Sequence, residues 1–153
     1  MSIVCRTLAA ESQGGLFFHA AALVNQTGGV LLPGNIGAGK STFTAWLLSR
    51  GLNYLTDEMV YFPLGAQTFQ PFYRPLHIKA PSRGVLAGMI DRQADINRIL
   101  RNNQSDLIPP DMLNSKTTFP ADDPSLRLIL FPRYAPQGDF IWQPLTPAET
   151  GWN

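Results

Sequence analysis

Charge is scarce in this sequence and almost balanced. Twelve lysines and arginines nearly cancel eleven aspartates and glutamates, which leaves a formal net charge of +1, and charged residues make up 15% of the chain. An average soluble domain carries about 25%. Because the whole molecule has no strong field, it offers no general attraction for nucleic acid or for an anionic membrane. We therefore expect neither as a partner, and any anion must be bound locally.

Cysteine and long apolar runs are scarce as well. The one cysteine, Cys5, has no partner for a disulfide within the chain, and the first residues lack the basic start and apolar run of a secretory signal. The longest apolar stretches, such as 126–131, are far shorter than the roughly 20 residues that cross a bilayer. Internal repeats and low-complexity segments are also missing. These absences favour a cytoplasmic protein without a membrane span.

The chain length of 153 residues suits one domain, which would bury about two thirds of its unfolded surface. We therefore expect a single domain over 1–153. Near the C-terminus, Thr146, Pro147 and Glu149 have the pattern of a helix cap, a first helical proline and a capping glutamate. Since the few residues that follow cannot form a helix with a buried face, we expect the domain to be truncated at its C-terminus.

Apolar runs separated by turn residues predict the order of the elements. An apolar strand over 16–24 and another over 30–32, joined by turn residues at 25–29, predict a hairpin. The further expected elements are a helix over 41–50, strands over 52–56, 59–64 and 75–79, a helix over 91–102, a proline-containing excursion over 103–124 and a buried strand over 125–131. Strands and helices that alternate in this way predict an α/β fold.

A glycine-rich segment follows the hairpin. Its residues satisfy the G-x-x-x-x-G-K-[ST] pattern of a phosphate-binding P-loop. A strand, a loop and a helix in this order let backbone N–H groups and the positive end of the helix converge on phosphate oxygens. Lys40 would neutralise the terminal phosphates and the Ser41 hydroxyl would bind Mg2+. A chance glycine-rich turn is the alternative, but the context favours a nucleotide site made by Gly34, Asn35, Ile36, Gly37, Ala38, Gly39, Lys40, Ser41 and Thr42.

Phosphoryl transfer also needs an acidic group beside the phosphates. Asp57 and Glu58 follow the predicted strand 52–56 and are the candidates, Asp57 for the metal and the pair for the proton of the acceptor. A solvated turn is the alternative interpretation. His19 lies in the predicted strand 16–24, where it is either a core histidine bonded to the backbone or a third catalytic residue.

These motifs, in this order, resemble the catalytic core of HPr kinase/phosphorylase and its HPr-kinase-like relatives. The likeness covers about residues 15 to 62 and rests on His19 with the Ala-Ala-Ala-Leu-Val that follows, on 29–42, on Arg50-Gly51 and on Asp57-Glu58. It implies a fold of the phosphoenolpyruvate carboxykinase type, a mixed sheet with a hairpin leading into the P-loop. It also implies that Lys40 and Ser41 bind ATP and magnesium, that the acidic pair serves the metal and the proton of an acceptor serine, and that His19 lies beside them.

The sequence departs from the family in two places. Glu58 stands where the family has a second aspartate, and the later Glu-Val-Arg-Gly-like signature is missing. Cations elsewhere could contact phosphate in its place, with a solvated surface charge as the alternative for each: Arg74, Lys79, Arg83 and Arg133.

We expect an ATP- and Mg2+-dependent kinase that transfers the γ-phosphate to a hydroxyl, such as a serine on a protein or peptide. A nucleotide-binding regulatory module with little transfer activity and a small-metabolite kinase are the alternatives. Members of the family form oligomers, which leaves a homo-oligomer open for this chain.

Overall fold

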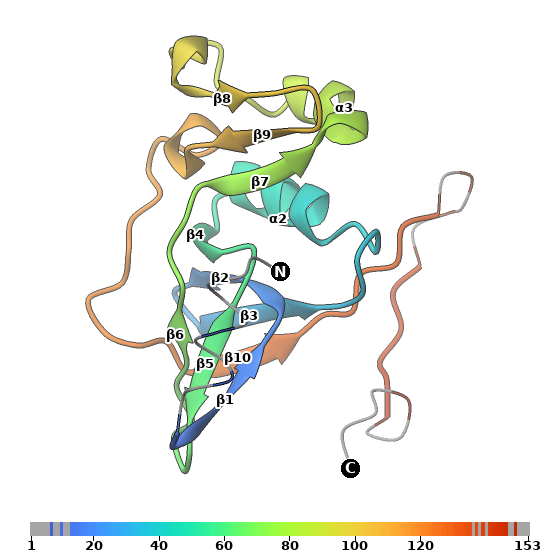
Figure 1. The fold of residues 1–153 in the computed structure, drawn as a ribbon. Coiled ribbons are helices and arrows are strands. Elements are labelled where there is room, and N and C mark those ends of the chain that lie inside the picture. The colour runs from blue at the N-terminus through green and yellow to red at the C-terminus, as the bar shows by residue number, and fades with distance from the viewer. Residues whose placement is uncertain are drawn as a thin grey trace.

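The computed structural model describes residues 7, 10, 13–135, 137, 139, 141–146 and 149, so Cys5 and Pro147 lie outside it. The described chain is a mixed α/β structure with three sheets (Figure 1). None of the helices in these ranges is both long and apolar enough to cross a membrane.

The central sheet contains the predicted hairpin. Its strands lie in the order β10 (Leu126–Ile129), β3 (Gly28–Pro33), β2 (Ala20–Asn25), β4 (Asn53–Thr56). The sheet is mixed, because β2 is antiparallel to β3 and β4 while β10 is parallel to β3. The hairpin turn is shorter than the expected 25–29, because β2 ends at Asn25 and β3 begins at Gly28. The Asn25 side chain accepts a hydrogen bond of 2.9 Å from the amide of Thr27, which stabilises this tight turn.

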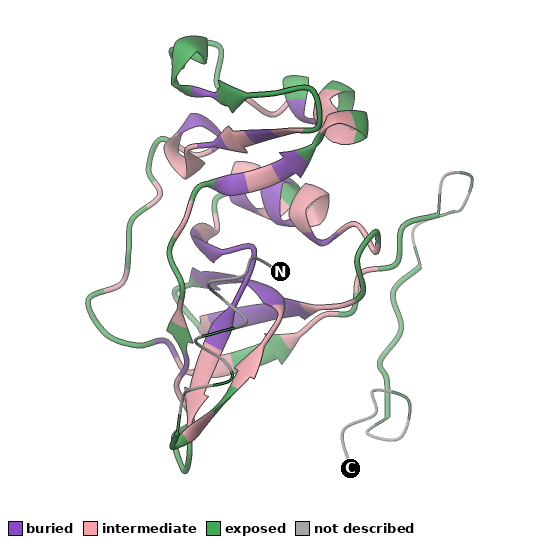
Figure 2. Cartoon of the chain, viewed as in Figure 1, coloured by how far each residue is buried: buried purple, intermediate pink, exposed green. Residues whose placement is uncertain are grey.

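Strand β2 is buried on both faces (Figure 2). Ala21 and Leu23 point into a cluster that also holds residues of the helix α2 (Lys40–Ser49). Ala20 and Ala22 point into a second cluster on the opposite face. A strand covered on both sides has no need of polar alternation, which explains the continuous apolar run of the sequence here.

Two further sheets cover these faces. Beyond α2 lies the antiparallel sheet β7-β9-β8, so the helix is held between two sheets (Figure 1). The antiparallel sheet β1-β5-β6 covers the other face. Their bounds are β1 (Gly15–Phe18), β5 (Val60–Pro63), β6 (Gln70–Pro71), β7 (Leu76–Lys79), β8 (Leu100–Arg101) and β9 (Ser105–Ile108), and the short helices are η1 (Ala80–Ser82), α3 (Arg83–Ala87), η2 (Ile96–Arg98) and η3 (Pro110–Met112).

The helix predicted over 91–102 is wrong. Turns, η2 and β8 occupy this segment. The side chains of Asp91 and Asp95 each accept a hydrogen bond from the amide two residues on, which stabilises turns in place of a helix. Ile96 and Leu100 are 63% and 68% exposed, so no apolar face is available that could bury a helix here.

Three other expectations need correction. The single strand expected over 16–24 breaks at His19, where the chain passes from β1 in one sheet to β2 in another. The excursion expected over 103–124 contains β9 and η3. The strand expected to be buried over 125–131 is the edge strand β10, in which Leu128 is 40% exposed.

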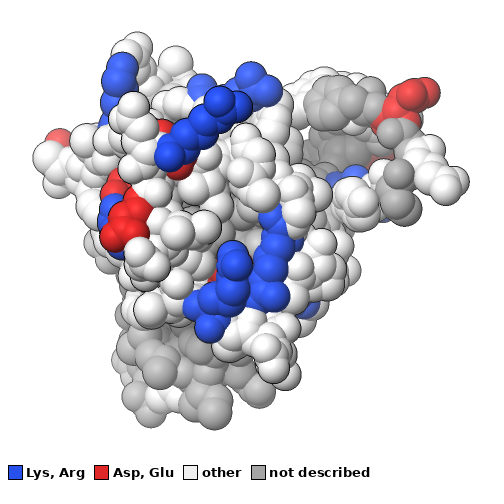
Figure 3. All heavy atoms as spheres, turned by 90° about the horizontal axis from the view of Figure 1, so that it is seen from above, with Lys and Arg blue, Asp and Glu red and all other residues white. Residues whose placement is uncertain are grey.

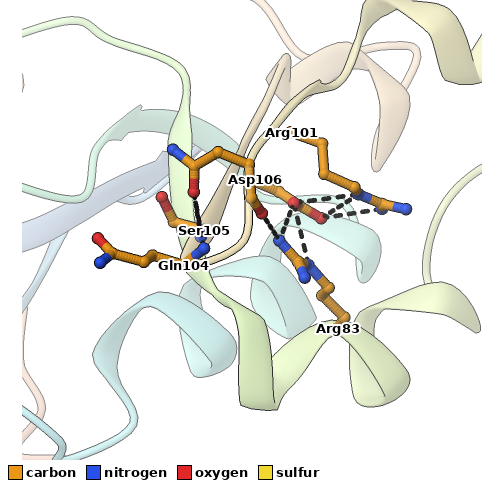
Figure 4. A network of polar contacts seen from close by, with 6 residues as sticks. Arg83, Arg101, Gln104, Ser105 and Asp106 are labelled. Atoms are coloured by element: carbon orange, nitrogen blue, oxygen red, sulfur yellow. Dashed lines mark hydrogen bonds and ion pairs between the residues drawn. The ribbon is translucent and has the colours of Figure 1, made fainter.

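A buried aspartate connects the elements that surround β9 (Figure 4). The side chain of Asp106 is 2% exposed and forms ion pairs of 2.8 Å with Arg83 and 2.9 Å with Arg101. Burial opposes the charge of Asp106, but the hydrogen bonds from Arg101 and Arg83 lower its pKa below the ordinary value. Arg83 also donates to the carbonyl oxygen of Asn102. Arg83 is therefore engaged in fastening α3 and β8 to β9.

Candidate functional site

The glycine-rich segment 34–41 connects the end of β3 to the start of α2. Gly37 and Gly39 have φ values of 91° and 92°, which is left-handed backbone that glycine adopts without strain. The amide of Ala38 donates a hydrogen bond of 3.2 Å to the carbonyl oxygen of Asn35 and closes a turn. The glycines of the motif thus shape a tight loop directly before the helix.

The first turn of α2 is open. Gly39 is the N-cap, no side chain caps it, and no acidic residue lies in the first turn. Amides at the start of a helix lack partners within the helix and carry partial positive charge. Ser41 and Thr42 follow in that turn and are half-buried. The end of the helix therefore offers donors and positive potential to an anion in the loop.

Lys40 folds back over the loop. Its side-chain Nζ donates hydrogen bonds of 2.5 Å and 3.1 Å to the carbonyl oxygens of Gly34 and Asn35. The residue is only 7% exposed, and burial lowers the pKa of its ammonium group, against the raising effect of Glu58 and Asp57. The ammonium group thus lies within electrostatic reach of the acidic pair.

Asp57 and Glu58 form a buried acidic pair in the bend between β4 and β5. They are 4% and 7% exposed, which rules out a solvated turn. The Asp57 carboxylate accepts hydrogen bonds from the Tyr54 hydroxyl at 3.2 Å and from the His77 amide at 2.7 Å. Burial raises the pKa of Asp57 above its ordinary value, although these donors and Arg74 oppose the shift.

Arg74 lies against both carboxylates. Its Nη1 is 2.9 Å from Oε2 of Glu58, and its Nε is 3.7 Å from Oδ1 of Asp57. The sequence suggested Arg74 as a phosphate contact, whereas the structure places it on the acidic pair. Its partners lie far from it in the sequence, and no local pattern indicated them.

His19 lies close to the acidic pair. Its Nδ1 is 2.7 Å from the backbone carbonyl oxygen of Glu58, and because a carbonyl only accepts, Nδ1 is the donor. His19 therefore bonds to backbone, as one of the two sequence interpretations expected, and does so beside the acidic pair; its catalytic role stays a prediction.

Of the remaining predicted cations, Arg83 is engaged by Asp106 and the other two are exposed. Lysine and arginine side chains gather on the face that carries the sheet β7-β9-β8 (Figure 3). Lys79 is exposed at the end of β7, and its charge contributes to the lowered pKa of Lys40. Arg133 is exposed after β10. Ile36, at the tip of the loop, is 74% exposed.

Sequence reasoning overlooked Tyr134. Because β10 runs parallel to β3, the residues that follow β10 reach the edge of the sheet where the loop begins. The amide of Tyr134 donates a hydrogen bond of 3.2 Å to the carbonyl oxygen of Ala38 in the loop. Only the pairing of two strands distant in sequence reveals this neighbour.

The donor chemistry of the site fits magnesium. Within the described ranges no three histidine, cysteine, aspartate or glutamate side chains gather into a metal-binding group. Magnesium on a nucleotide needs fewer protein ligands, because phosphate and water oxygens complete its octahedron. Hydroxyl and carboxylate oxygens of Ser41 and Asp57 are ligands that this hard cation prefers.

Comparison of the chain with protein-family models, with curated proteins and with solved structures found no match. Function is therefore inferred from the site alone.

Arg74→Met is expected to lower the free energy of unfolding by about 2 to 4 kcal/mol at pH 7, because it removes a cation that contacts two buried carboxylates. The loss should shrink at pH 4, where protonation lowers the charge of the acidic pair. Urea unfolding at both pH values measures it. Arg98→Met is the matched control, since its ion pair with Asp111 is about half exposed and worth less than about 1 kcal/mol. Equal losses in the two variants would contradict the prediction.

Proposed function

We propose that the chain is an ATP- and Mg2+-dependent kinase related to HPr kinase/phosphorylase, with a fold of the phosphoenolpyruvate carboxykinase type, that transfers the γ-phosphate to a serine hydroxyl of a protein or peptide. One observation carries the proposal. Strands β3 and β4 both run antiparallel to β2, so the loop that follows β3 and carries Lys40 lies at the same edge of the central sheet as the buried carboxylates that follow β4. A seat for phosphate beside a proton acceptor is the arrangement that phosphoryl transfer requires.

The loop supports the binding half of this function. Backbone N–H groups of the glycine-rich segment and of the first turn of α2 can donate to phosphate oxygens. Lys40 would exchange its hydrogen bonds to the carbonyls of Gly34 and Asn35 for stronger, charge-assisted bonds to phosphate. Magnesium, when bound, would neutralise part of the phosphate charge. Ser41 with Glu58 would hold it, in place of the Asp57 expected from the sequence, because Asp57 is needed as the proton acceptor.

The environment of Asp57 supports the catalytic half. A general base works best when its pKa lies near the operating pH, and burial shifts the pKa of Asp57 in that direction. The Tyr54 hydroxyl and the His77 amide hold its two oxygens in place. The Glu58 carboxylate is already engaged by Arg74, whose Nη1 lies 2.9 Å from its Oε2. We therefore assign the proton of the acceptor hydroxyl to Asp57 and an orienting part to Glu58 and His19.

A nucleotide-binding regulatory module is the second candidate. Arg74 contacts both carboxylates, and an acidic pair held in this way could stabilise a bound nucleotide without transferring phosphate. In this case the same loop would bind ATP with little turnover.

Labelled ATP separates the candidates. The chain would be incubated with γ-labelled ATP, Mg2+ and an extract of the source cells, and its ATP binding measured by calorimetry. We expect a labelled protein or peptide. Label in a small-molecule fraction would replace the protein acceptor by a metabolite, and binding without label would favour the regulatory module. A folded chain that binds no nucleoside triphosphate would refute all three.

A further inference from the structure

The segment that follows β10 lies beside the glycine-rich loop. The amide of Leu130 donates a hydrogen bond of 2.8 Å to the carbonyl oxygen of Leu31 in β3, which continues the parallel pairing to the end of both strands. Ligands of open α/β sheets bind where the carboxyl ends of parallel strands meet. Figure 1 shows the chain running from β10 along this edge to the loop that precedes α2. The segment 131–135 therefore lies beside the glycine-rich loop.

Tyr134 has one backbone hydrogen bond to the loop, and its Cβ lies close to Gly39. Its amide binds the carbonyl oxygen of Ala38, and its Cβ lies 3.3 Å from the place that a Cβ on Gly39 would occupy. Glycine at this N-cap position is therefore favoured both by its positive φ and by the approach of Tyr134. The aromatic side chain consequently starts next to the first turn of α2.

The ring of Tyr134 remains open to solvent. It is 72% exposed, and within the part of the chain that the structure describes no ring contact involves it. Other tyrosines on the surface pack against a phenylalanine: Tyr61 on Phe17 at 4.7 Å and Tyr73 on Phe119 at 4.4 Å between ring centres. An exposed aromatic ring on a backbone that is hydrogen-bonded to the loop is suited to stacking against a planar ligand.

We propose that Tyr134 is the platform on which the base of the bound nucleoside triphosphate stacks. The inference rests on the proposed function, since phosphates seated in the loop leave the sugar and base to extend past the first turn of α2, where Tyr134 begins. Stacking on an aromatic ring is tolerant of sequence because every base has a π-face. Tyr134 thus adds affinity for a nucleotide of either purine and none for the phosphate chain alone.

Calorimetry with three ligands tests this role: ATP, GTP and inorganic tripolyphosphate, each with Mg2+. Tyr134→Ala should weaken the binding of ATP and of GTP about tenfold, because the base loses its stacking partner. The affinity of Tyr134→Ala for tripolyphosphate should stay within about twofold of the wild-type affinity, because this ligand has no base. Tyr134→Phe keeps the ring and should retain the ATP affinity within about twofold. Tyr134→Leu keeps the bulk of the side chain without a π-face and should lose as much affinity for ATP and GTP as the alanine variant. It serves as a second test if the alanine variant folds poorly.

Three results would overturn the platform while leaving the kinase proposal intact. If Tyr134→Ala bound ATP with wild-type affinity, the ring would contribute nothing to nucleotide binding. Weak binding by Tyr134→Phe would transfer the effect to the hydroxyl group. An equal loss for tripolyphosphate would mean that Tyr134 shapes the loop. Failure of the wild-type protein to bind any of the three ligands would overturn the proposed function as well, so the two failures are distinguishable.

Discussion

Lys40→Ala is expected to weaken ATP binding about 100-fold and to abolish phosphoryl transfer. Lys40 is the cation that folds over the loop, and its Nζ is held at the carbonyls of Gly34 and Asn35. A charge-assisted hydrogen bond from a buried ammonium group to phosphate contributes about 2 to 3 kcal/mol, which corresponds to this change in affinity. Calorimetric titration with ATP and Mg2+ measures the binding, and label transferred from γ-labelled ATP measures the reaction.

The substitution should leave the fold intact. Burial lowers the pKa of Lys40, so holding this charge in the protein has a cost that partly offsets its two hydrogen bonds. We expect the free energy of unfolding to change by less than about 1 kcal/mol. Lys116→Ala, which removes an exposed lysine from the segment after η3, is the matched control and should bind ATP as the wild type does. If Lys40→Ala also bound and transferred normally, neither the loop nor the kinase proposal would stand.

The parts of the site that follow from the sequence are those set by local spacing. Glycines at fixed offsets before Lys40, an apolar strand ahead of them and a helical period behind them place the loop between β3 and α2. The acidic pair follows directly from the end of the predicted strand 52–56, which the structure has as β4 over 53–56. Near the C-terminus the Thr146 amide donates a hydrogen bond of 2.8 Å to the Glu149 carboxylate, half of the expected capping box.

The parts that the sequence could not give depend on pairing across distance. Arg74 reaches Glu58 because the segment before β7 is fastened across the bend, in part by a 2.7 Å hydrogen bond from the Thr56 hydroxyl to the carbonyl oxygen of Phe72. Tyr134 reaches the loop because β10 adds to the edge of the sheet beside β3. Both depend on strand order, which apolar periodicity does not encode.

The wrong helix over 91–102 has a different cause. Apolar residues at Ile96, Ile99 and Leu100 have helical spacing, yet only Ile99 is buried, at 8% exposed. With one apolar anchor in place of a stripe, burial gives little support to a helix. Local bonds from aspartate side chains to the backbone then decide the conformation.

Asp57→Asn is expected to lower the rate of phosphoryl transfer by about 1,000-fold while ATP binding stays within about threefold of the wild type. The amide keeps the shape of the carboxylate: its oxygen can accept from the His77 amide, and its NH2 group can donate to the Tyr54 hydroxyl oxygen, so the bend is preserved. It cannot accept the proton of the acceptor hydroxyl, a loss that typically costs 100- to 10,000-fold. Single-turnover transfer of label, with binding measured separately, distinguishes lost chemistry from lost affinity.

The pH profile identifies the group that is lost. Because burial raises the pKa of Asp57, kcat/KM of the wild type should fall as the pH drops through that raised value, and the residual rate of Asp57→Asn should lack this limb.

The raised pKa also means that the folded protein binds the proton more tightly than the unfolded chain. The free energy of unfolding should then rise as the pH falls from the raised value to the ordinary one, and the asparagine variant should not show this gain. Asp122→Asn, an exposed carboxylate, is the control and should change neither profile. A full rate with an unchanged acid limb in Asp57→Asn would assign the proton to another group, with Glu58 the next to be substituted.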